Sequence, residues 1–217
     1  SAVFFPDWIP RLHGDFKDAS LSVESHNLPE CLARLDEGEA DYVAALFDAR
    51  GAVATRLGVG PDINGYLGLA LGTERLVPVC APNAAGQPLF ELGRNGTPAS
   101  FLDYASECHL GWSLQAALQD FGLPLQRQHA ASLANGLHFM AASGLGVAWL
   151  PHTLVREDLA ARRLVRAGGP ELDIPLHLTL LRRPMPLANQ AQRLWDYLEE
   201  LSGEPQSRDG VAPALVE

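Results

Sequence analysis

The sequence lacks any apolar run long enough to cross a membrane, and it has few cysteines and few basic residues. No uncharged apolar stretch among its 217 residues reaches about 18, so we predict no membrane span. The N-terminus lacks the basic flank and apolar core of a secretion signal, although processing removes such segments from mature chains. The three cysteines, Cys31, Cys80 and Cys108, form no CxxC pair, which favours a reducing cytoplasm.

Positive charge is also scarce. The chain has 16 Lys and Arg against 26 Asp and Glu, giving a net charge of −10 and an isoelectric point near 5.1. Such a surface repels the phosphates of nucleic acids and of anionic lipids. The chain alone is therefore a poor candidate for binding DNA or a membrane, and the basic cluster Arg162, Arg163 and Arg166 is typical of a solvated face.

The common catalytic motifs are missing as well. Gly-x-Ser-x-Gly, HExxH and the P-loop pattern do not occur, and none of the seven histidines has metal-ligand spacing to another His or Cys. Cys108 and His109 suggest a nucleophile or a metal ligand, but sequence neighbours rarely form a catalytic pair. We therefore predict no catalysis, no bound metal and no cofactor.

The first part of the chain has the pattern of a β-α-β unit. Alternating apolar residues predict a half-buried strand over 19–25. Asn27 is an expected N-cap for an amphipathic helix that ends at Gly38. The nearly continuous apolar run 40–47 then predicts a strand in the middle of a parallel sheet.

A second α/β block follows an irregular connection. Residues 48–65 predict a loop, and the Pro- and Gly-rich stretch 82–98 predicts an exposed connection between two subdomains. Ser132 is an expected helix cap. The other expected elements are strands over 66–71, 74–81, 99–105, 123–130 and 174–183, helices over 111–122 and 187–201, and a loose C-terminal tail.

The glycines of "SGLGVAWLP" raise the question of a phosphate-binding loop. Gly144 and Gly146 follow a helix and precede a buried strand. A phosphate loop requires the reverse order, in which a strand leads through glycines to a helix N-terminus. We interpret Gly144 as the left-handed residue that ends the helix and Pro151 as the start of the next one, so these glycines turn the chain.

Four segments occur in an order and spacing found in one family. They are "ECLARLDEGEADYVAAL" (30–46), "ERLVPVCAP" (74–82), "SGLGVAWLP" with later leucines (143–164) and "PLHLTLLRRP" (175–184) before a final helix. The third resembles the "aGlGia-lP" signature of the effector-binding domain of LysR-type transcriptional regulators, and the others are similar to that family's corresponding strands. The resemblance covers nearly the whole chain.

The resemblance implies an α/β fold of two Rossmann-like subdomains joined by two crossing strands, as in type 2 periplasmic binding proteins. It places the first subdomain at residues 1–77 plus 180–217 and the second at residues 78–179. The family's winged helix-turn-helix and linker helix have no counterpart in this sequence, in agreement with its acidic charge. The first sheet strand is expected before Ser1, so another segment is expected to fill that position.

In such folds, ligands bind beyond the carboxyl ends of strands, at helix N-termini that face the cleft. The resemblance makes three turns in this position the effector contacts, and Ser132 is a weaker fourth. Amides and hydroxyls there suit a carboxylate or other small anion. The candidate ligand-binding residues are Ser1, Ser25, His26, Asn27, Ser106, Cys108, His109 and Ser132.

Several of these residues have a simpler interpretation. Asn27 caps a helix whatever else it does, and His26 is also typical of a solvated loop. Trp112 and Trp149 are expected in the core, and either is able to line the cleft.

Three functions are consistent with the sequence. The first is the effector-sensing and oligomerising domain of a LysR-type regulator. This hypothesis implies a cytoplasmic homodimer or homotetramer, a small-molecule effector and DNA contact only through a helix-turn-helix outside this sequence. The alternative is a transporter-type solute-binding protein of the same fold. The third is a small α/β enzyme that uses the cleft.

Overall fold

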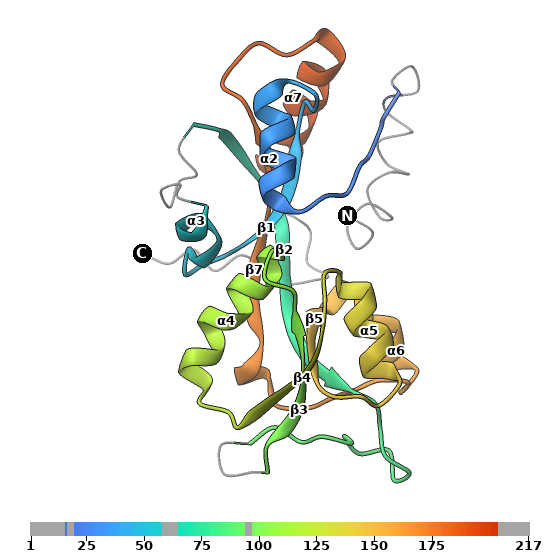
Figure 1. Cartoon of the computed structure of the whole chain (residues 1–217). Helices are drawn as coiled ribbons and strands as arrows, with labels where there is room; N and C mark the ends of the chain where they lie inside the picture. Colours follow the sequence, from blue (N-terminus) through green and yellow to red (C-terminus); the bar gives the residue numbers. More distant parts are fainter. Residues whose placement is uncertain (1–15, 17–19, 58–64, 94–96, 204–217) are drawn as a thin grey trace.

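Two long antiparallel strands connect two lobes of the protein (Figure 1). These strands are β2 (Leu67–Cys80) and β7 (Ile174–Arg182) in the computed structural model, which describes residues 16, 20–57, 65–93 and 97–203. Lobe I contains α2 (Leu28–Glu37), β1 (Val43–Asp48), α3 (Ala52–Arg56) and α7 (Asn189–Gly203). Lobe II contains β3 (Ala99–Tyr104), α4 (His109–Phe121), β4 (Leu125–Ala131), α5 (Ala134–Ala142), β5 (Ala148–Pro151), α6 (His152–Ala160), β6 (Val165–Arg166) and the 3-10 turn η1 (Pro170–Leu172).

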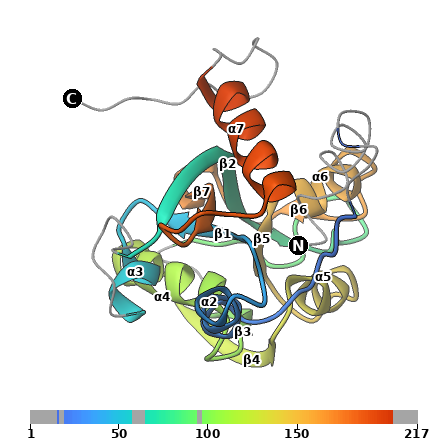
Figure 2. The same ribbon diagram turned by 90° about the horizontal axis from the view of Figure 1, so that it is seen from above.

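The larger sheet has the strand order β1-β7-β2-β5, and β6 also pairs with β2. The apolar run 40–47 does form a strand, but its expected place inside a parallel sheet is wrong, because β1 pairs antiparallel with β7. Seen from above, α7 lies on one side of these strands and α2 on the other (Figure 2). Neighbouring β7 residues serve the two sides: Leu181 packs in the cluster with α2, and Leu180 packs with Trp195 of α7.

The capping prediction for α2 is confirmed. The Asn27 side chain accepts a hydrogen bond from the backbone N–H of Glu30 at 2.9 Å, and Gly38 ends the helix with a left-handed φ of 79°. Leu28 and Leu35 are almost fully buried, so the predicted apolar face packs against lobe I. Capping and amphipathicity both act within a few residues, which is why the sequence predicts this helix well.

The strand expected over 19–25 is not formed in the described part of that segment. Residues 20–27 make no ladder there, and Leu21 and Val23 are 50% and 41% exposed. A strand needs a neighbour to pair its N–H and C=O groups, and alternation of apolar residues cannot supply one. Most of the expected C-terminal tail lies outside the described residues.

Two further predictions need correction around β2. The strands expected over 66–71 and 74–81 are one continuous strand whose pairing register with β7 shifts between Ala70 and Gly72. Such an irregularity absorbs an extra residue without ending the strand, so glycine there does not mark a turn. The loop expected over 48–65 contains the short helix α3.

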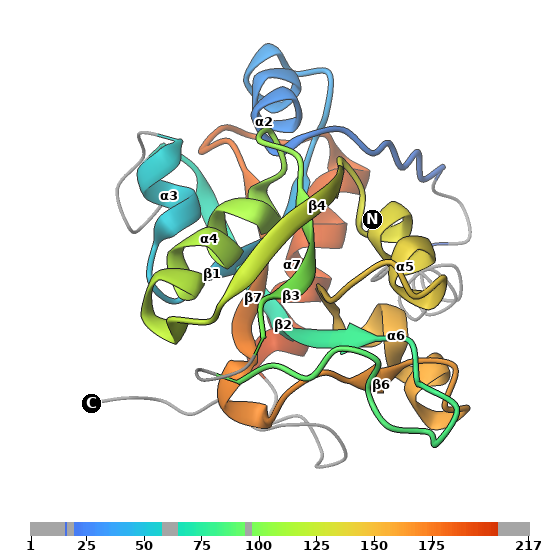
Figure 3. The same cartoon turned by 60° about the horizontal axis from the view of Figure 1, so that its bottom comes forward.

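Lobe II is built around the parallel pair β3 and β4, with α4 beside one flank and α5 beside the other (Figure 3). Its core includes the fully buried Trp149, whose indole N–H donates to the carbonyl of Leu172 at 2.9 Å. The ring of Phe101 packs edge-on against that indole, with centroids 5.9 Å apart. The prediction that Trp149 belongs to the core is confirmed.

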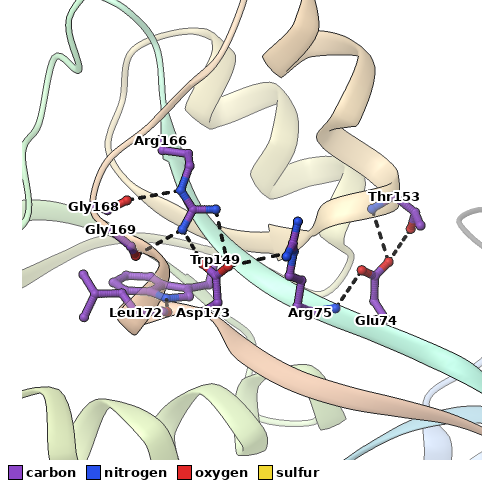
Figure 4. A network of polar contacts seen from close by, with 9 residues as sticks. All are labelled: Glu74, Arg75, Trp149, Thr153, Arg166, Gly168, Gly169, Leu172 and Asp173. Carbon is purple, nitrogen blue, oxygen red and sulfur yellow. Dashed lines mark hydrogen bonds and ion pairs between the residues drawn. The ribbon is translucent and has the colours of Figure 1, made fainter. Parts of the chain in front are cut away.

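A polar network connects β2 to the start of α6, to β6 and to the residue before β7 (Figure 4). The nearly buried carboxylate of Glu74 accepts hydrogen bonds from the backbone N–H of Thr153 at 3.2 Å and from its hydroxyl. Pro151, the N-cap residue of α6, has no side-chain capping group, so Glu74 caps this helix from another element. Beside it, Asp173 pairs with both Arg75 and Arg166.

The interpretation of Gly144 as a chain-turning residue is confirmed, whereas Gly146 lies outside the turn and permits a close approach of two strands. Gly144 follows α5 with a φ of 78°, which favours glycine. Gly146 lies where β5 approaches β3, and a Cβ there would stand 2.6 Å from the carbonyl oxygen of Ser100. That oxygen accepts the backbone N–H of Val147 at 2.8 Å, so it cannot move away freely.

We expect Gly146→Ala to lower the free energy of unfolding by about 1–3 kcal/mol, because the added methyl group overlaps backbone atoms. Chemical denaturation measures this loss. Gly93→Ala is the control, since a Cβ at this exposed position meets no atom within 4 Å. Equal stability of the two variants would contradict the close approach of β5 and β3.

Candidate functional site

The predicted turn of lobe I precedes the N-terminus of α2. His26 lies between two carboxylates, with Nε2 3.1 Å from Glu24 and Nδ1 2.9 Å from Glu30. Asn27 uses its side-chain oxygen as the cap of α2. Its amide nitrogen is the group of this side chain left to donate to a ligand. Ser1 lies outside the described residues.

The predicted turn of lobe II runs from Ser106 to His109 and leads into α4. The Ser106 hydroxyl donates to the carboxylate of Glu107 at 3.1 Å, and the Ser132 hydroxyl donates to the same carboxylate at 3.3 Å. The structure therefore brings Ser106 and Ser132 together through Glu107. The expected helix cap at Ser132 is wrong, because the N-cap of α5 is Leu133 and no side chain caps that helix.

Burial controls the chemistry of the two residues that follow. Cys108 is the N-cap residue of α4, and burial raises the pKa of its thiol, which keeps it protonated and unreactive near neutral pH. Burial likewise lowers the pKa of the His109 imidazole to about 4. Both groups are therefore neutral at physiological pH. Cys108 is therefore not a thiolate nucleophile, and His109 is not a cation that could bind an anion.

The His109 pKa gives a measurable expectation. In NMR titrations the His109 imidazole should keep its neutral chemical shifts from pH 8 down to about 5.5, well past the model histidine pKa near 6.5. Because the folded pKa is depressed, His109 contributes stability above the unfolded pKa. That contribution is lost as the pH falls from about 6.5 toward 4. A midpoint for His109 at or above about 6.5 would contradict its burial.

The two turns face one another across the lobe boundary. In Figure 1 the N-terminal end of α2 points toward lobe II, and the turn before α4 lies at the top of lobe II. Trp112 in the first turn of α4 packs against the apolar cluster of lobe I, and its indole N–H donates to the carbonyl of Ser106 at 2.7 Å. Of the two locations expected for Trp112, the structure supports the lobe boundary.

An open groove of about 1200 Å³ extends from this boundary along α3 and α4. Ser106 lines it together with Trp112, and the other predicted site residues that the structure describes do not. The lining carries three guanidinium groups and one carboxylate, those of Arg50, Arg56, Arg127 and Asp103. The groove is thus locally basic on an acidic chain.

The sequence analysis missed the most connected polar residue at the boundary. Asp48, at the end of β1, is 7% exposed and accepts backbone N–H groups from Arg50, Ala52 and Val53. Its carboxylate also accepts the hydroxyl of Ser113 from α4 at 3.2 Å. An Asp placed directly after a buried strand and before a glycine is the signal that could have indicated this cap.

Two searches of the described part of the chain were negative. No group of three or more His, Cys, Asp or Glu side chains there has the arrangement needed to hold a metal ion. No helix among the described residues is long and apolar enough to cross a membrane.

Comparison with solved structures identifies the class of fold to which this chain belongs. The regulatory domain of HypT from Salmonella typhimurium superposes with a TM-score of 0.72 at 24% identity, covering 92% of this chain and 90% of that one. Regulatory domains of this kind have the two-lobed fold of type 2 periplasmic binding proteins, with two Rossmann-like subdomains, as expected from the sequence.

The family follows from the sequence match. The LysR substrate binding domain matches residues 1–202, and the chain belongs to this family. HTH-type transcriptional regulator YjiE of Escherichia coli (strain K12) is 25% identical over 181 residues, 83% of this chain but 56% of that protein. HTH domain-truncated transcriptional regulator QseD of Escherichia coli O157:H7 is equally similar, over 70% of its length. The chain thus spans little more than half of its full-length relative.

Proposed function

We propose that this chain is the effector-sensing and oligomerising domain of a LysR-type transcriptional regulator, and that it binds its effector between the two lobes. The observation that carries the proposal is the pair of polar turns, Ser25–Asn27 and Ser106–His109, at helix N-termini on opposite sides of the lobe boundary. A ligand that contacts both turns binds one lobe angle more tightly than others and so shifts the population of conformations.

Regulation of transcription then requires a DNA-binding domain on the same protein or on a partner. The acidic charge of this chain gives no attraction to phosphates, so DNA contact is assigned to a helix-turn-helix like those named for the relatives. We propose that the protein acts in the cytoplasm as a homodimer or homotetramer, since paired domains match paired operator half-sites. The subdomain limits 1–77 plus 180–217 and 78–179 remain predictions, and they fall within β2 and β7.

The effector is proposed to carry an anionic group. Regulatory domains of the same fold have been solved with bromide, for HypT from Salmonella typhimurium, and with sulfate, for OxyR2 from Vibrio vulnificus. In this chain the carboxylate of Glu107 competes with an anionic ligand, because it already accepts hydrogen bonds from the hydroxyls of Ser106 and Ser132. An anionic effector has to displace Glu107, and this competition makes the proposal testable.

The test screens sulfate, bromide and a panel of small carboxylates by thermal stabilisation and then measures affinities by calorimetry at constant ionic strength. Ser106→Ala should weaken a stabilising anion by about 0.5–3 kcal/mol, since one hydroxyl donor is lost. Glu107→Gln should strengthen it, since a competing charge is removed. No stabilisation by any anion, or equal affinities in both variants, would contradict an anionic effector at this turn.

Binding without turnover is the activity that we propose. The family is a domain of transcriptional regulators and not an enzyme family, and the neutral Cys108 and His109 agree with a binding role. The relatives YjiE and QseD are transcriptional regulators, which favours this role over that of a transporter-type solute-binding protein.

A further inference from the structure

Helix α4 belongs to lobe II by chain order, but it contacts lobe I along its length. It packs against α3 and β1 as well as against β3 of its own lobe. At its N-terminal turn, the guanidinium of Arg56 lies over the Trp112 ring, 5.3 Å from the centroid. The side chain of Trp112 is also part of the apolar cluster around α2 and β1. The position of α4 is therefore set partly by lobe I.

A buried hydrogen bond fixes the next turn of the helix. Ser113 is 1% exposed, and its hydroxyl donates to the Asp48 carboxylate at 3.2 Å. Asp48 is itself held by three backbone N–H groups of the β1–α3 segment at 3.1–3.2 Å. Because these three bonds fix the orientation of the carboxylate, its remaining lone pair points in one direction. The position of the Ser113 hydroxyl that donates to it is fixed in turn.

An ion pair extends the same contact two turns further along α4. Arg50 pairs with Asp120, and its guanidinium also donates to the carbonyl of Ala116 at 3.5 Å. Ser113, Ala116 and Asp120 are spaced i, i+3, i+7, which puts them on one face of the helix. Arg50 and Asp120 are half or more exposed, so the pair adds little stability, but it adds a second point that opposes rotation of α4.

The turn of lobe II that contains Ser106 is connected directly to α4. Ser106, Cys108 and His109 lead directly into α4, and the Trp112 indole donates to the carbonyl of Ser106. A shift of α4 relative to α3 therefore shifts the lobe II turn relative to His26 and Asn27 of lobe I. We propose that Asp48, Arg50 and Ser113 are positioning residues that set the separation of the two halves of the site. Only the meaning of this separation for ligand binding depends on the proposed function.

The test measures the distance between the lobes without any ligand. Spin labels are placed at Ala33→Cys on α2 and Gln128→Cys on β4, both exposed, in a background with Cys31→Ser and Cys108→Ser. The double variant Arg50→Gln with Ser113→Ala removes the two polar side-chain contacts from Arg50 and Asp48 to α4 and leaves the Asp48 cap of α3 intact. Pulsed electron paramagnetic resonance should then show a distance distribution that broadens or shifts by more than about 2 Å.

The control removes one Arg–Asp ion pair and one serine hydroxyl hydrogen bond within lobe II. It combines Arg163→Gln, which breaks the pair with Asp158, and Ser143→Ala, which breaks the bond to the Phe139 carbonyl. Its distance distribution should equal that of the parent. An unchanged distribution in the Arg50 and Ser113 variant, or an equal change in the control, would overturn the proposal. If the double variant does not fold, Arg50→Gln alone, at an exposed position, must show a smaller change in the same direction.

The two proposals fail separately. A changed distance together with no binding of the anion panel leaves the positioning role intact and removes the proposed effector. An unchanged distance together with normal anion binding removes the positioning role alone.

Discussion

Asp48→Ala is expected to lower the free energy of unfolding by at least about 3 kcal/mol, a large loss for one substitution. The carboxylate accepts four hydrogen bonds, and hydrogen bonds to a charged group contribute about 1.5–3 kcal/mol each. Removing it leaves the nearly inaccessible Ser113 hydroxyl and the N-terminal amides of α3 without their acceptor. Urea denaturation followed by circular dichroism measures the loss.

Two further variants serve as references for the Asp48→Ala result. Asp48→Asn keeps one acceptor oxygen and should lie between Asp48→Ala and the wild-type protein. Asp196→Ala is the matched control, because Asp196 is exposed and accepts a solvent-accessible hydrogen bond from Gln192, and its loss should stay within about 0.5 kcal/mol. The account of Asp48 is wrong if Asp48→Ala is no less stable than Asp196→Ala.

Glu74→Ala is the second substitution with a large expected effect, about 2–3 kcal/mol. Glu74 is 7% exposed and accepts hydrogen bonds from the backbone N–H of Arg75 at 2.7 Å and from the N–H and hydroxyl of Thr153. Its loss combines the removal of a helix cap, about 1 kcal/mol, with partly buried donors that lose their acceptor. Glu157→Ala on the exposed side of α6 should be nearly neutral.

A double-mutant cycle separates the contribution of the hydrogen bonds between Glu74 and Thr153 from other effects of the Glu74 substitution on stability. If Glu74 acts through Thr153, the losses in Glu74→Ala and Thr153→Ala should be non-additive, with a coupling energy of about 1–2 kcal/mol. Losses that add within about 0.5 kcal/mol would show that the bond between β2 and α6 contributes nothing to stability.

The sequence predicts those parts of this protein whose structure is set by neighbours along the chain. Asn27, Gly38 and Gly144 occupy the expected positions, because caps and left-handed turns depend on a few adjacent residues. The strand expected at Leu21 and Val23 is wrong, since pairing depends on residues far away. The same reason explains the antiparallel position of β1, whose partner lies more than a hundred residues further along the chain.

In the candidate site too, features set by chain order could be predicted and contacts between distant segments could not. Ser106 lies at the lobe boundary as the fold resemblance implies, because strand-to-helix turns are fixed by chain order. The contacts of Glu107 with Ser106 and Ser132, and of Asp48 with Ser113, join segments that no periodicity relates. Contacts of this kind can only be found in the structure.

We propose that one small molecule binds both turns at the lobe boundary. The most direct measurement is a titration of the ¹⁵N-labelled chain with whichever member of the anion panel stabilises it most, followed through backbone amide chemical shifts. We expect saturable shifts, with one common dissociation constant, in Ser25–Asn27 and in Ser106–His109. Saturable shifts confined to one lobe or to surfaces away from both turns would contradict it.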